Sequence, residues 1–451
     1  MGTADSTAGD AMPRAFDRLA APFRVFAANK LAGAVLLMVA AVVAIVWANS
    51  PWAASYFAWL SAPLSVGVGG AALEKPILLW INDGLMGVFF FHVGLEIKRE
   101  LLAGELSTAR KAALPAIAAV GGMVVPACLY FAINAGLPTA RGWGIPMATD
   151  IAFALGVLAL LGDRVPVGLK VFLTALAIVD DIGAILVIAL FYTEDLAVTS
   201  LAIGLGLYAI AIALNRAHVR SPIAYFILGT LVWLAFLKSG VHATVAALLM
   251  AFTIPSRTRV DGARFIERLQ HHVAELRRVG VPEDHGINTV EQQHALDGVS
   301  EAAQDAGAPL LRLEHALVPV VTFLVMPIFA LANAGVAIEG DLMDAVTSPI
   351  TIGIVVGLFL GKQVGVSLFT WLAVRLRVAD LPHGVTWLQI YGASLLAGVG
   401  FTMSLFIAGL AFPDPATLNL AKVGILAASL VAAILGFAAV RRATREPPSA
   451  E

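Results

Sequence analysis

The sequence predicts an all-α membrane protein, and three features of its composition and patterning support this fold class. Of the 451 residues, 59% are hydrophobic and 13% are charged, whereas soluble domains carry roughly 45–50% apolar and about 25% charged residues. The mean hydropathy is +0.87. The apolar residues gather in runs of about 20, which is the length that a helix needs to cross a bilayer. A soluble fold could not bury this much apolar surface.

Twelve apolar runs predict twelve transmembrane helices. They lie at 31–49, 77–97, 113–135, 144–161, 167–192, 199–215, 222–237, 240–254, 316–336, 349–373, 387–412 and 419–440. If both termini are cytoplasmic, the basic residues on the cytoplasmic side are Lys98, Arg99, Arg110, Lys111, Arg164, Arg216, Arg220, Arg375, Arg377, Arg441, Arg442 and Arg445. The opposite loops around 194–195 and 339–344 contain acidic residues and no basic ones. This positive-inside asymmetry favours cytoplasmic termini and an even number of spans.

The predicted organisation has one membrane domain between two short tails. In order, the parts are a cytoplasmic tail at 1–29, a transmembrane domain at 30–441 and a cytoplasmic tail at 442–451. A polar insertion at 255–312 interrupts the membrane domain, and we expect a solvated cytoplasmic loop with a helix at 262–278. Residues 13–29 predict a short interfacial helix, and the loop 51–76 predicts a small hairpin.

Charge and cysteine content exclude two further classes of interaction. The formal net charge is -2, so no bulk field attracts nucleic acid. The single cysteine, Cys128, cannot form a disulfide within the chain. We expect the lipid bilayer to be the main macroscopic partner of this chain.

Ionisable residues inside the predicted spans are the candidate functional residues, because a bilayer excludes charges that have no function. Asp150 follows Pro146, which lacks an N–H group and disrupts a helix. A carboxylate at such a break is stabilised by the free N–H groups of the next half-helix. Unwound backbone also frees carbonyl oxygens that can coordinate a cation.

Two adjacent acids and one lysine complete this set. Asp180 and Asp181 lie near the middle of one span, and Lys362 lies in the middle of another. Neighbours on a helix point about 100° apart, so we expect one carboxylate to line a cavity and the other to meet a partner. Two carboxyls in a poorly hydrated site should not both ionise easily. Such a pair can exchange a proton for a metal cation, and a buried lysine needs a carboxylate partner.

A second break is predicted in the eleventh span, at Gly398 and Gly400. The fourth and eleventh spans occupy corresponding places in two trios of helices. We therefore expect two inverted repeats in which the interrupted helices 4 and 11 cross. Paired interrupted helices of this kind mark the ion site of secondary transporters.

Seven stretches of the sequence resemble the NhaA-type sodium/proton antiporter family. They are residues 80–86, 93–100, 148–156, 179–184, 240–244, 332–335 and 400–404. The resemblance covers roughly 30–254 and 312–440. The NhaA family is itself a standard example of inverted repeats with broken helices, so the resemblance and the paired breaks are not independent observations.

The resemblance implies an ion and proton site made by Asp150, Asp180, Asp181 and the neighbouring Thr149. In this family pattern Asp150 and Asp181 are ligands of the transported sodium, and Asp181 is the more direct one. Asp180 is the implied partner of Lys362. No other metal and no cofactor is expected.

The resemblance also implies a cytoplasmic pH-sensing rim. Its members are Glu96, Arg99, Glu100, Glu314 and His315, together with His242. The residues at 96–100 also fit an ordinary helix end with ion pairs three and four residues apart. His242 also fits a structural, hydrogen-bonded histidine.

The function that the resemblance implies is electrogenic, pH-regulated export of sodium or lithium in exchange for protons. The protein would be a secondary transporter rather than an enzyme, a homodimer, and a multi-pass protein of the bacterial inner membrane. Two alternative functions would each require a further feature. A sodium-coupled organic-anion symporter of related fold would need a cationic pocket, and an intramembrane aspartyl protease would carry Tyr-Asp and Gly-x-Gly-Asp motifs, which are absent.

Overall fold

The structure, a computed structural model, describes residues 31–68, 71–193, 196–280, 289–337 and 342–444. These residues are almost entirely helical. The elements are α2 (Ala32–Ala48), α3 (Ala53–Ser61), β1 (Pro63–Val68), β2 (Ala71–Pro76), α4 (Ile77–Trp80), η1 (Ile81–Leu85), α5 (Met86–Ala103), α6 (Ala109–Asn134), η2 (Pro138–Met147), α7 (Ile151–Ala159), η3 (Gly162–Arg164), α8 (Val167–Phe191), α9 (Val198–Arg216), α10 (Pro222–Leu237), α11 (Ala243–Thr253), α12 (Gly262–Val279), α13 (Val290–Ala306), α14 (Pro309–Val320), η4 (Val321–Val325), α15 (Met326–Asn333), α16 (Leu342–Thr347), α17 (Pro349–Val355), η5 (Val356–Gly361), α18 (Lys362–Arg375), α19 (Trp387–Ala397), α20 (Phe401–Ala411) and α21 (Pro415–Ala443). The interfacial helix expected at 13–29 lies outside the described residues.

Several helices begin at local sequence signals. The side chains of Ser221, Ser348 and Asp414 each accept a hydrogen bond from a backbone N–H in the first turn of the helix that follows, and proline occupies the next position in all three. Such caps satisfy N–H groups that have no partner within the helix. The hydrogen bonds that Thr417 donates also lower the pKa of the Asp414 carboxyl. These helix starts are therefore encoded locally.

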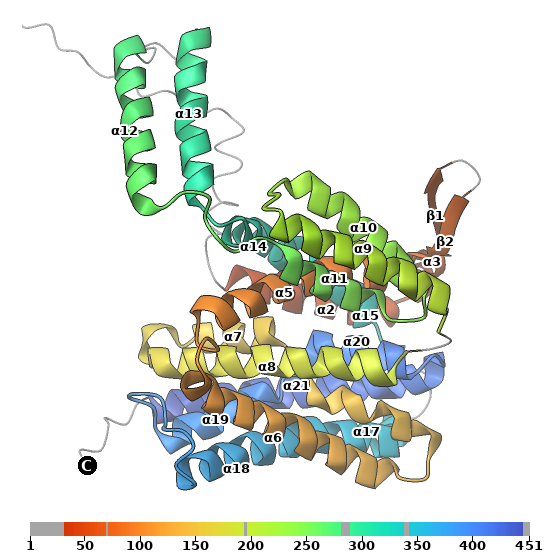
Figure 1. Ribbon diagram of the computed structural model, residues 1–451. Helices are drawn as coiled ribbons and strands as arrows, with labels where there is room; N and C mark the ends of the chain where they lie inside the picture. The colour runs from red at the N-terminus through yellow and green to blue at the C-terminus, as the bar shows by residue number, and fades with distance from the viewer. Residues whose placement is uncertain (1–30, 69–70, 194–195, 281–288, 338–341, 445–451) are drawn as a thin grey trace, which may run out of the picture.

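The helices form two groups with separate apolar cores. In Figure 1 α9, α10 and α11 lie above, with α5 and α14 beside them, and α6, α17, α18, α19 and α21 lie below, with α8 at the boundary. The upper group has a core that includes Leu95, Tyr225, Val232 and Met250. The lower group belongs to a larger core that continues into α2, α15 and α20. The intramembrane acids of the sequence lie at α7 and α8, within the larger core.

The lengths and compositions of the described helices fit a multi-pass membrane protein. Seven helices are long and apolar enough to cross a membrane, and there are up to 10 candidates if each of three bent helix pairs counts as one span. The apolar helices α10 and α11 are shorter than these candidates and are not counted among them. A helix lies in each predicted span, so the all-α membrane class is confirmed, while the total of twelve spans stays a prediction.

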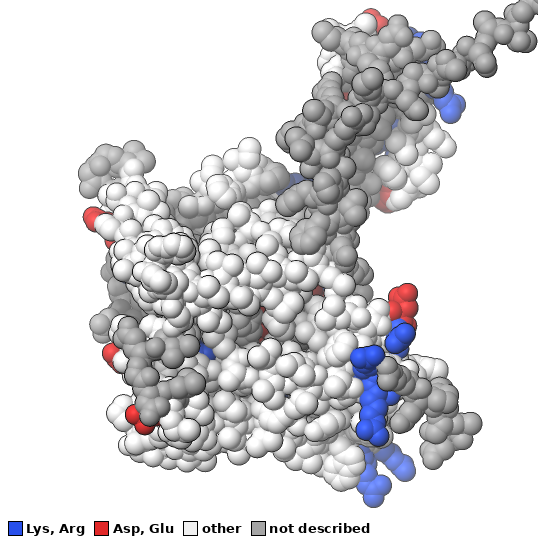
Figure 2. Space-filling view, turned by 180° about the vertical axis from the view of Figure 1, so that it is seen from behind, with Lys and Arg blue, Asp and Glu red and all other residues white. Residues whose placement is uncertain are grey.

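The outer surface of the bundle is apolar. Large hydrophobic side chains such as Val42, Leu190 and Phe226 are 58%, 74% and 75% exposed. Figure 2 shows one face with a broad band that carries almost no charge, with Lys and Arg mostly at one edge and Asp and Glu at the opposite edge. A soluble monomer rarely exposes so large an apolar surface. This apolar band is suited to contact with the lipid of a bilayer.

Two segments outside the spans form ordered hairpins. β1 and β2 pair antiparallel, with Leu64 opposite Lys75 and Val66 opposite Leu73, which confirms the small hairpin predicted in the loop 51–76. The insertion holds α12, which confirms the predicted helix at 262–278, and a second helix, α13, that the sequence analysis did not predict. Figure 1 shows α12 and α13 side by side and standing away from the bundle. The expectation of a solvated loop was therefore incomplete.

Helices α6 and α18 approach each other most closely at two glycines. A Cβ atom on Gly121 would lie 2.4 Å from the backbone oxygen of Gly365, and a Cβ atom on Gly365 would lie 2.1 Å from the backbone oxygen of Gly121. Small residues at helix crossings let backbones pack this closely in membranes. The contact lies three residues from Lys362, so it fixes the height at which that lysine enters the core.

Replacing Gly121 with Ala is expected to lower the thermal stability of the purified protein. The added methyl group cannot avoid backbone atoms of α18, and overpacking of this kind costs about 1–3 kcal/mol. Melting of the protein in detergent measures the effect. Gly206→Ala in α9 is the matched control, because no atom lies within 4 Å of a Cβ atom there. Equal melting temperatures for the two variants would contradict the proposed close contact.

Candidate functional site

Two helix pairs inside the bundle are interrupted at similar angles. η2 and α7 are bent by 42° and α19 and α20 by 41°. Gly398 ends α19 and Gly400 precedes α20, so the second break lies where the glycines predicted it. The first break differs in detail. Pro146 lies inside the 3₁₀ helix η2, and the chain becomes extended only after Met147, because a tight 3₁₀ turn tolerates proline.

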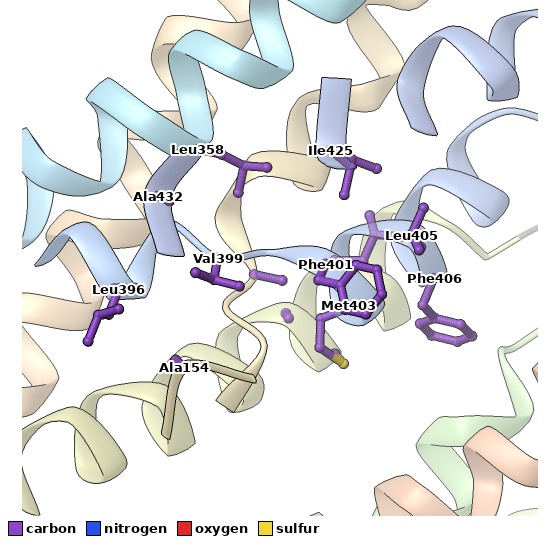
Figure 3. Close-up of a cluster of buried hydrophobic side chains, with 14 of the residues drawn as sticks. Ala154, Leu358, Leu396, Val399, Phe401, Met403, Leu405, Phe406, Ile425 and Ala432 are labelled. Carbon is purple, nitrogen blue, oxygen red and sulfur yellow. The ribbon is translucent and has the colours of Figure 1, made fainter. Parts of the chain in front are cut away.

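The two breaks contact each other. The backbone N–H of Asp150 donates to the carbonyl oxygen of Val399 at 2.7 Å. The Ser404 hydroxyl donates to the carbonyl oxygen of Ile145 at 2.8 Å. Figure 3 shows Val399, between α19 and α20, among apolar side chains that include Leu396. The unwound backbone of each pair therefore satisfies polar groups of the other in a region without water-accessible surface.

Asp150 lies between the N-termini of two half-helices. Its Oδ1 accepts the N–H of Phe153 in α7 at 2.9 Å. Its Oδ2 accepts the N–H of Thr402 in α20 at 3.1 Å and also the Thr402 hydroxyl. The carboxyl is 1% exposed. Because both helix N-termini carry partial positive charge, they stabilise an anion here.

Asp180 connects α8 to α18 and to the first break. Its Oδ2 forms an ion pair with Nζ of Lys362, and both residues are fully buried. The Oγ1 of Thr149 lies 2.6 Å from the same carboxylate oxygen and 2.8 Å from the carbonyl oxygen of Ala397. A hydroxyl has one hydrogen, so Thr149 can donate to only one of these acceptors at a time. The π-helical turn η5 directly precedes Lys362, and such turns are frequent at functional sites.

Two carboxylate oxygens in this cluster have no hydrogen-bond partner among the described residues. They are Oδ1 of Asp180 and Oδ1 of Asp181, and both are buried. Asp181 interacts electrostatically with Asp180, Glu96 and Asp150. A buried oxygen without a partner is costly, and either a proton or a hard cation would satisfy it. The donor set, which consists of carboxylates with nearby hydroxyl and carbonyl oxygens, fits a sodium-like cation.

A second charge cluster joins α5 to α14. The Arg99 guanidinium lies 2.7 Å from Glu100, 2.9 Å from Glu314 and 3.8 Å from Glu96. Glu100 also accepts the backbone N–H of Glu105 at 2.8 Å. One arginine therefore contacts three carboxylates where the C-terminal end of α5 meets α14, the helix that follows the insertion. This is more than an ordinary pair on one helix surface, because Glu314 comes from a different element.

The two predicted histidines are not part of this charge cluster. His315 is exposed on α14, and no hydrogen bond or ion pair links it to the cluster within the described residues. His242 precedes α11 and contacts Thr244 through Nδ1 at 3.1 Å, and its ring lies 5.3 Å from that of Phe406. The C-terminal end of α11 is the end that meets Lys98, so the length of α11 separates His242 from Arg99.

The contact of Thr402 with Asp150 was not predicted from the sequence. Thr402 lies two residues after Gly400, and its N–H is one of the first in α20. A polar residue at the start of the second half-helix could have signalled this contact. The hydrogen bond that the Asn333 amide donates to the Asn82 side chain at 2.8 Å was not predicted either. Contacts across such distances in sequence have no local signature.

Comparison with known proteins gives a consistent result over nearly the whole chain. The family described as Na+/H+ antiporter 1 matches residues 24–440. A protein of Oleidesulfovibrio alaskensis named Na(+)/H(+) antiporter NhaA is 51% identical over 431 residues, which cover 96% of this chain and 96% of that protein. A protein of the same name from Koribacter versatilis is 50% identical and covers 98% of this chain and 97% of its own length. The Na(+)/H(+) antiporter NhaA 1 of Saccharophagus degradans is 47% identical, with 94% and 93% covered.

Proposed function

Because the chain belongs to the Na⁺/H⁺ antiporter 1 family, it is a sodium/proton antiporter, and we propose that its buried acidic cluster carries the exchange. The cluster consists of Asp150, Asp180, Asp181, Thr149 and Lys362. The observation that carries this proposal is the pair of buried oxygens, one on Asp180 and one on Asp181, that have no hydrogen-bond partner in the part of the chain that the structure describes. Protons and a hard cation can satisfy them in turn. The family assignment favours the antiporter over the two alternative functions, the organic-anion symporter and the aspartyl protease.

The proposed cycle is a competition between sodium and protons for the same oxygens. When cytoplasmic pH is high, the aspartates lose their protons and bind sodium, with Asp181 as the more direct ligand and Asp150 as the second. Thr149 turns its single hydrogen away from Asp180 and towards Ala397, which frees carboxylate electron density for the cation. The loaded site then opens to the other side, where protons displace sodium. Sodium therefore stabilises the sodium-loaded state of the site, and protons stabilise the protonated state.

We propose that the exchange is electrogenic and accepts lithium as well as sodium. Two carboxyls that release their protons for one monovalent ion move net charge across the membrane. The ion pair with Lys362 balances the charge of Asp180, so the two carboxyls in this count are those of Asp150 and Asp181. Oxygen ligands bind both small alkali ions.

We propose that the Arg99 cluster regulates transport in response to pH. Arg99 holds three carboxylates from two elements, so a change in their protonation would alter the contact between α5 and α14. Glu96 also acts electrostatically on Asp181, which supports a link from the cluster to the ion site. We include His242 in this proposed regulation because its ring lies next to α20. We include His315 because it follows Glu314 in the chain.

The remaining architecture is also a proposal. Twelve crossings in two inverted repeats, with both termini cytoplasmic in a bacterial inner membrane, account for the paired breaks and for the charge asymmetry of the loops. A homodimer is supported by the β1–β2 hairpin, because Leu64 and Val66 on it are 45% and 54% exposed. Exposed apolar strands are suited to contact a second copy of the chain.

Everted membrane vesicles that contain this protein test the proposed exchange. A pH-sensitive dye follows the vesicle interior after sodium, lithium or potassium is added, from neutral to alkaline pH. We expect alkalinisation with sodium and lithium but not with potassium, and acceleration when a membrane potential of the driving sign is imposed. No response to any cation, from protein that is correctly inserted, would overturn the proposal. A response that is insensitive to potential would overturn its electrogenic part alone.

Thr402→Ala is expected to raise the sodium concentration needed for half-maximal exchange while the maximal rate changes less. The substitution removes one of the hydrogen bonds that hold Asp150 between the two helix N-termini, and a hydrogen bond to a charged group is worth roughly 1.5–3 kcal/mol. Thr402→Ser keeps the hydroxyl and serves as the matched control. The same sodium dependence in all three proteins would show that Thr402 does not position Asp150.

A further inference from the structure

The insertion between α11 and α14 is a firmly anchored pair of helices. α12 and α13 pack side by side and stand away from the bundle (Figure 1). At the base, the N–H of Leu310 donates to the carbonyl oxygen of Pro255 at 3.1 Å, and the N–H of Arg259 donates to that of Asp305 at 3.0 Å. The two ends of the insertion are therefore held together where it leaves the membrane domain. Nothing in the proposed transport cycle uses its side chains.

Three side chains on one face of α12 combine the ligand types of a transition-metal site. They are His271, His272 and Glu275, and one ligand atom from each lies within 4.8 Å of the other two. Positions three and four apart lie on the same face of a helix, so Glu275 meets both histidines. The two imidazole rings are 5.3 Å apart. Two nitrogens and one carboxylate oxygen are thus close enough together for one ion to contact all three.

The contact between His272 and Glu275 fits a bridging ion better than a hydrogen bond. Nδ1 of His272 is buried and has no hydrogen-bond partner among the described residues. It lies 3.6 Å from Oε2 of Glu275, which is longer than a hydrogen bond. Two ligand atoms on a tetrahedral zinc ion are about 3.4 Å apart, given metal–ligand distances near 2.1 Å. An ion between these atoms would satisfy the buried nitrogen with little movement.

The neighbouring helix carries a glycine beside this nitrogen. A Cβ atom on Gly298 of α13 would lie 2.5 Å from Nδ1 of His272, so a larger residue there would displace the imidazole. Arg268, one turn before His272 on α12, is turned to Asp305 at 3.2 Å. That ion pair offsets a positive charge which would otherwise oppose a metal cation.

We propose that His271, His272 and Glu275 form a divalent transition-metal site of the zinc type on the insertion. Two imidazoles and a carboxylate suit zinc, nickel or cobalt, whereas magnesium and calcium prefer oxygen ligands alone. The same preference separates this site from the transported sodium, whose ligands in the acidic cluster are all oxygens. With three protein ligands, water completes the tetrahedron.

Cobalt(II) is the probe that tests this site in the full-length protein. The protein is purified in detergent without a polyhistidine tag and treated with a chelator. We expect one equivalent of cobalt to give the visible absorption of tetrahedral coordination, and zinc to displace it. His272→Ala is expected to abolish the band, and Glu275→Gln to weaken cobalt binding by at least about tenfold. His294→Ala, which removes an exposed histidine from α13, is the matched control and should leave the titration unchanged.

Two outcomes would overturn the proposal. One is a wild-type protein that shows no tetrahedral band at any cobalt concentration. The other is an equal band in His272→Ala and His294→Ala, which would mean that cobalt binds scattered surface histidines. Circular dichroism of each variant shows whether α12 and α13 are still folded. If His272→Ala loses helix, Glu275→Gln decides, because it keeps the size of the side chain.

Discussion

Replacing Asp181 with Asn is expected to reduce sodium-dependent exchange to the level of vesicles that lack the protein. Oδ1 of Asp181 is buried without a hydrogen-bond partner among the described residues, so no structural contact through that oxygen is lost with the charge. The amide keeps the size of the side chain but neither binds a proton nor carries a negative charge. Because both halves of the exchange need the carboxylate, the loss should be complete. The dye assay in everted vesicles measures it at several sodium concentrations.

The matched control for this variant is Asp163→Asn, which makes the same change at an exposed residue between α7 and α8. It should leave the exchange unchanged. Melting temperatures of the two purified variants separate a loss of function from a loss of fold. Sodium-dependent exchange in a folded Asp181→Asn protein would remove Asp181 from the proposed mechanism.

The candidate site could be predicted in part because a bilayer makes intramembrane charge conspicuous. Asp150, Asp180, Asp181 and Lys362 are ionisable residues within apolar runs, and the structure brings them into one buried region around two helix breaks. Helix geometry predicted only that one of the adjacent acids meets a partner, and the family resemblance implied that this acid is Asp180. The structure has the ion pair between Asp180 and Lys362. Hydropathy was sufficient to find the four ionisable residues but not to assign their roles.

Other features could not be predicted, because they depend on contacts between distant segments. The first break was expected at Pro146, yet the chain accommodates that proline in a 3₁₀ helix and unwinds two residues later, where Asp150 can reach the N-terminus of α20. The bend between α2 and α3 lies at Pro51, which predicts the end of α2 but not the angle of 111°. The second helix of the insertion was missed because the apolar residues of α13 follow a helical period less clearly than those of α12.

Lys362→Ala is expected to destabilise the protein more than any other single change considered for the ion site. The variant leaves Asp180 fully buried without its cationic partner. Asp180 must then either remain an unpaired charge or take up a proton, and removal of one member of a buried ion pair costs about 3–5 kcal/mol. Thermal melting in detergent measures the change. Lys111→Ala is the control, because Lys111 is 55% exposed in a pair 3.9 Å long and should contribute within about 1 kcal/mol.

A double-variant cycle separates the ion pair from the space that the lysine fills. Asp180→Asn removes the charge that Lys362→Ala leaves unpaired, so the double variant should melt at a higher temperature than Lys362→Ala alone. Simple loss of packing predicts the opposite order, because the second substitution would then add to the first. The Thr149 hydroxyl lies against Asp180 in either case and cannot replace an ammonium charge. The sign of the coupling therefore shows whether Lys362 balances Asp180 electrostatically in the resting protein.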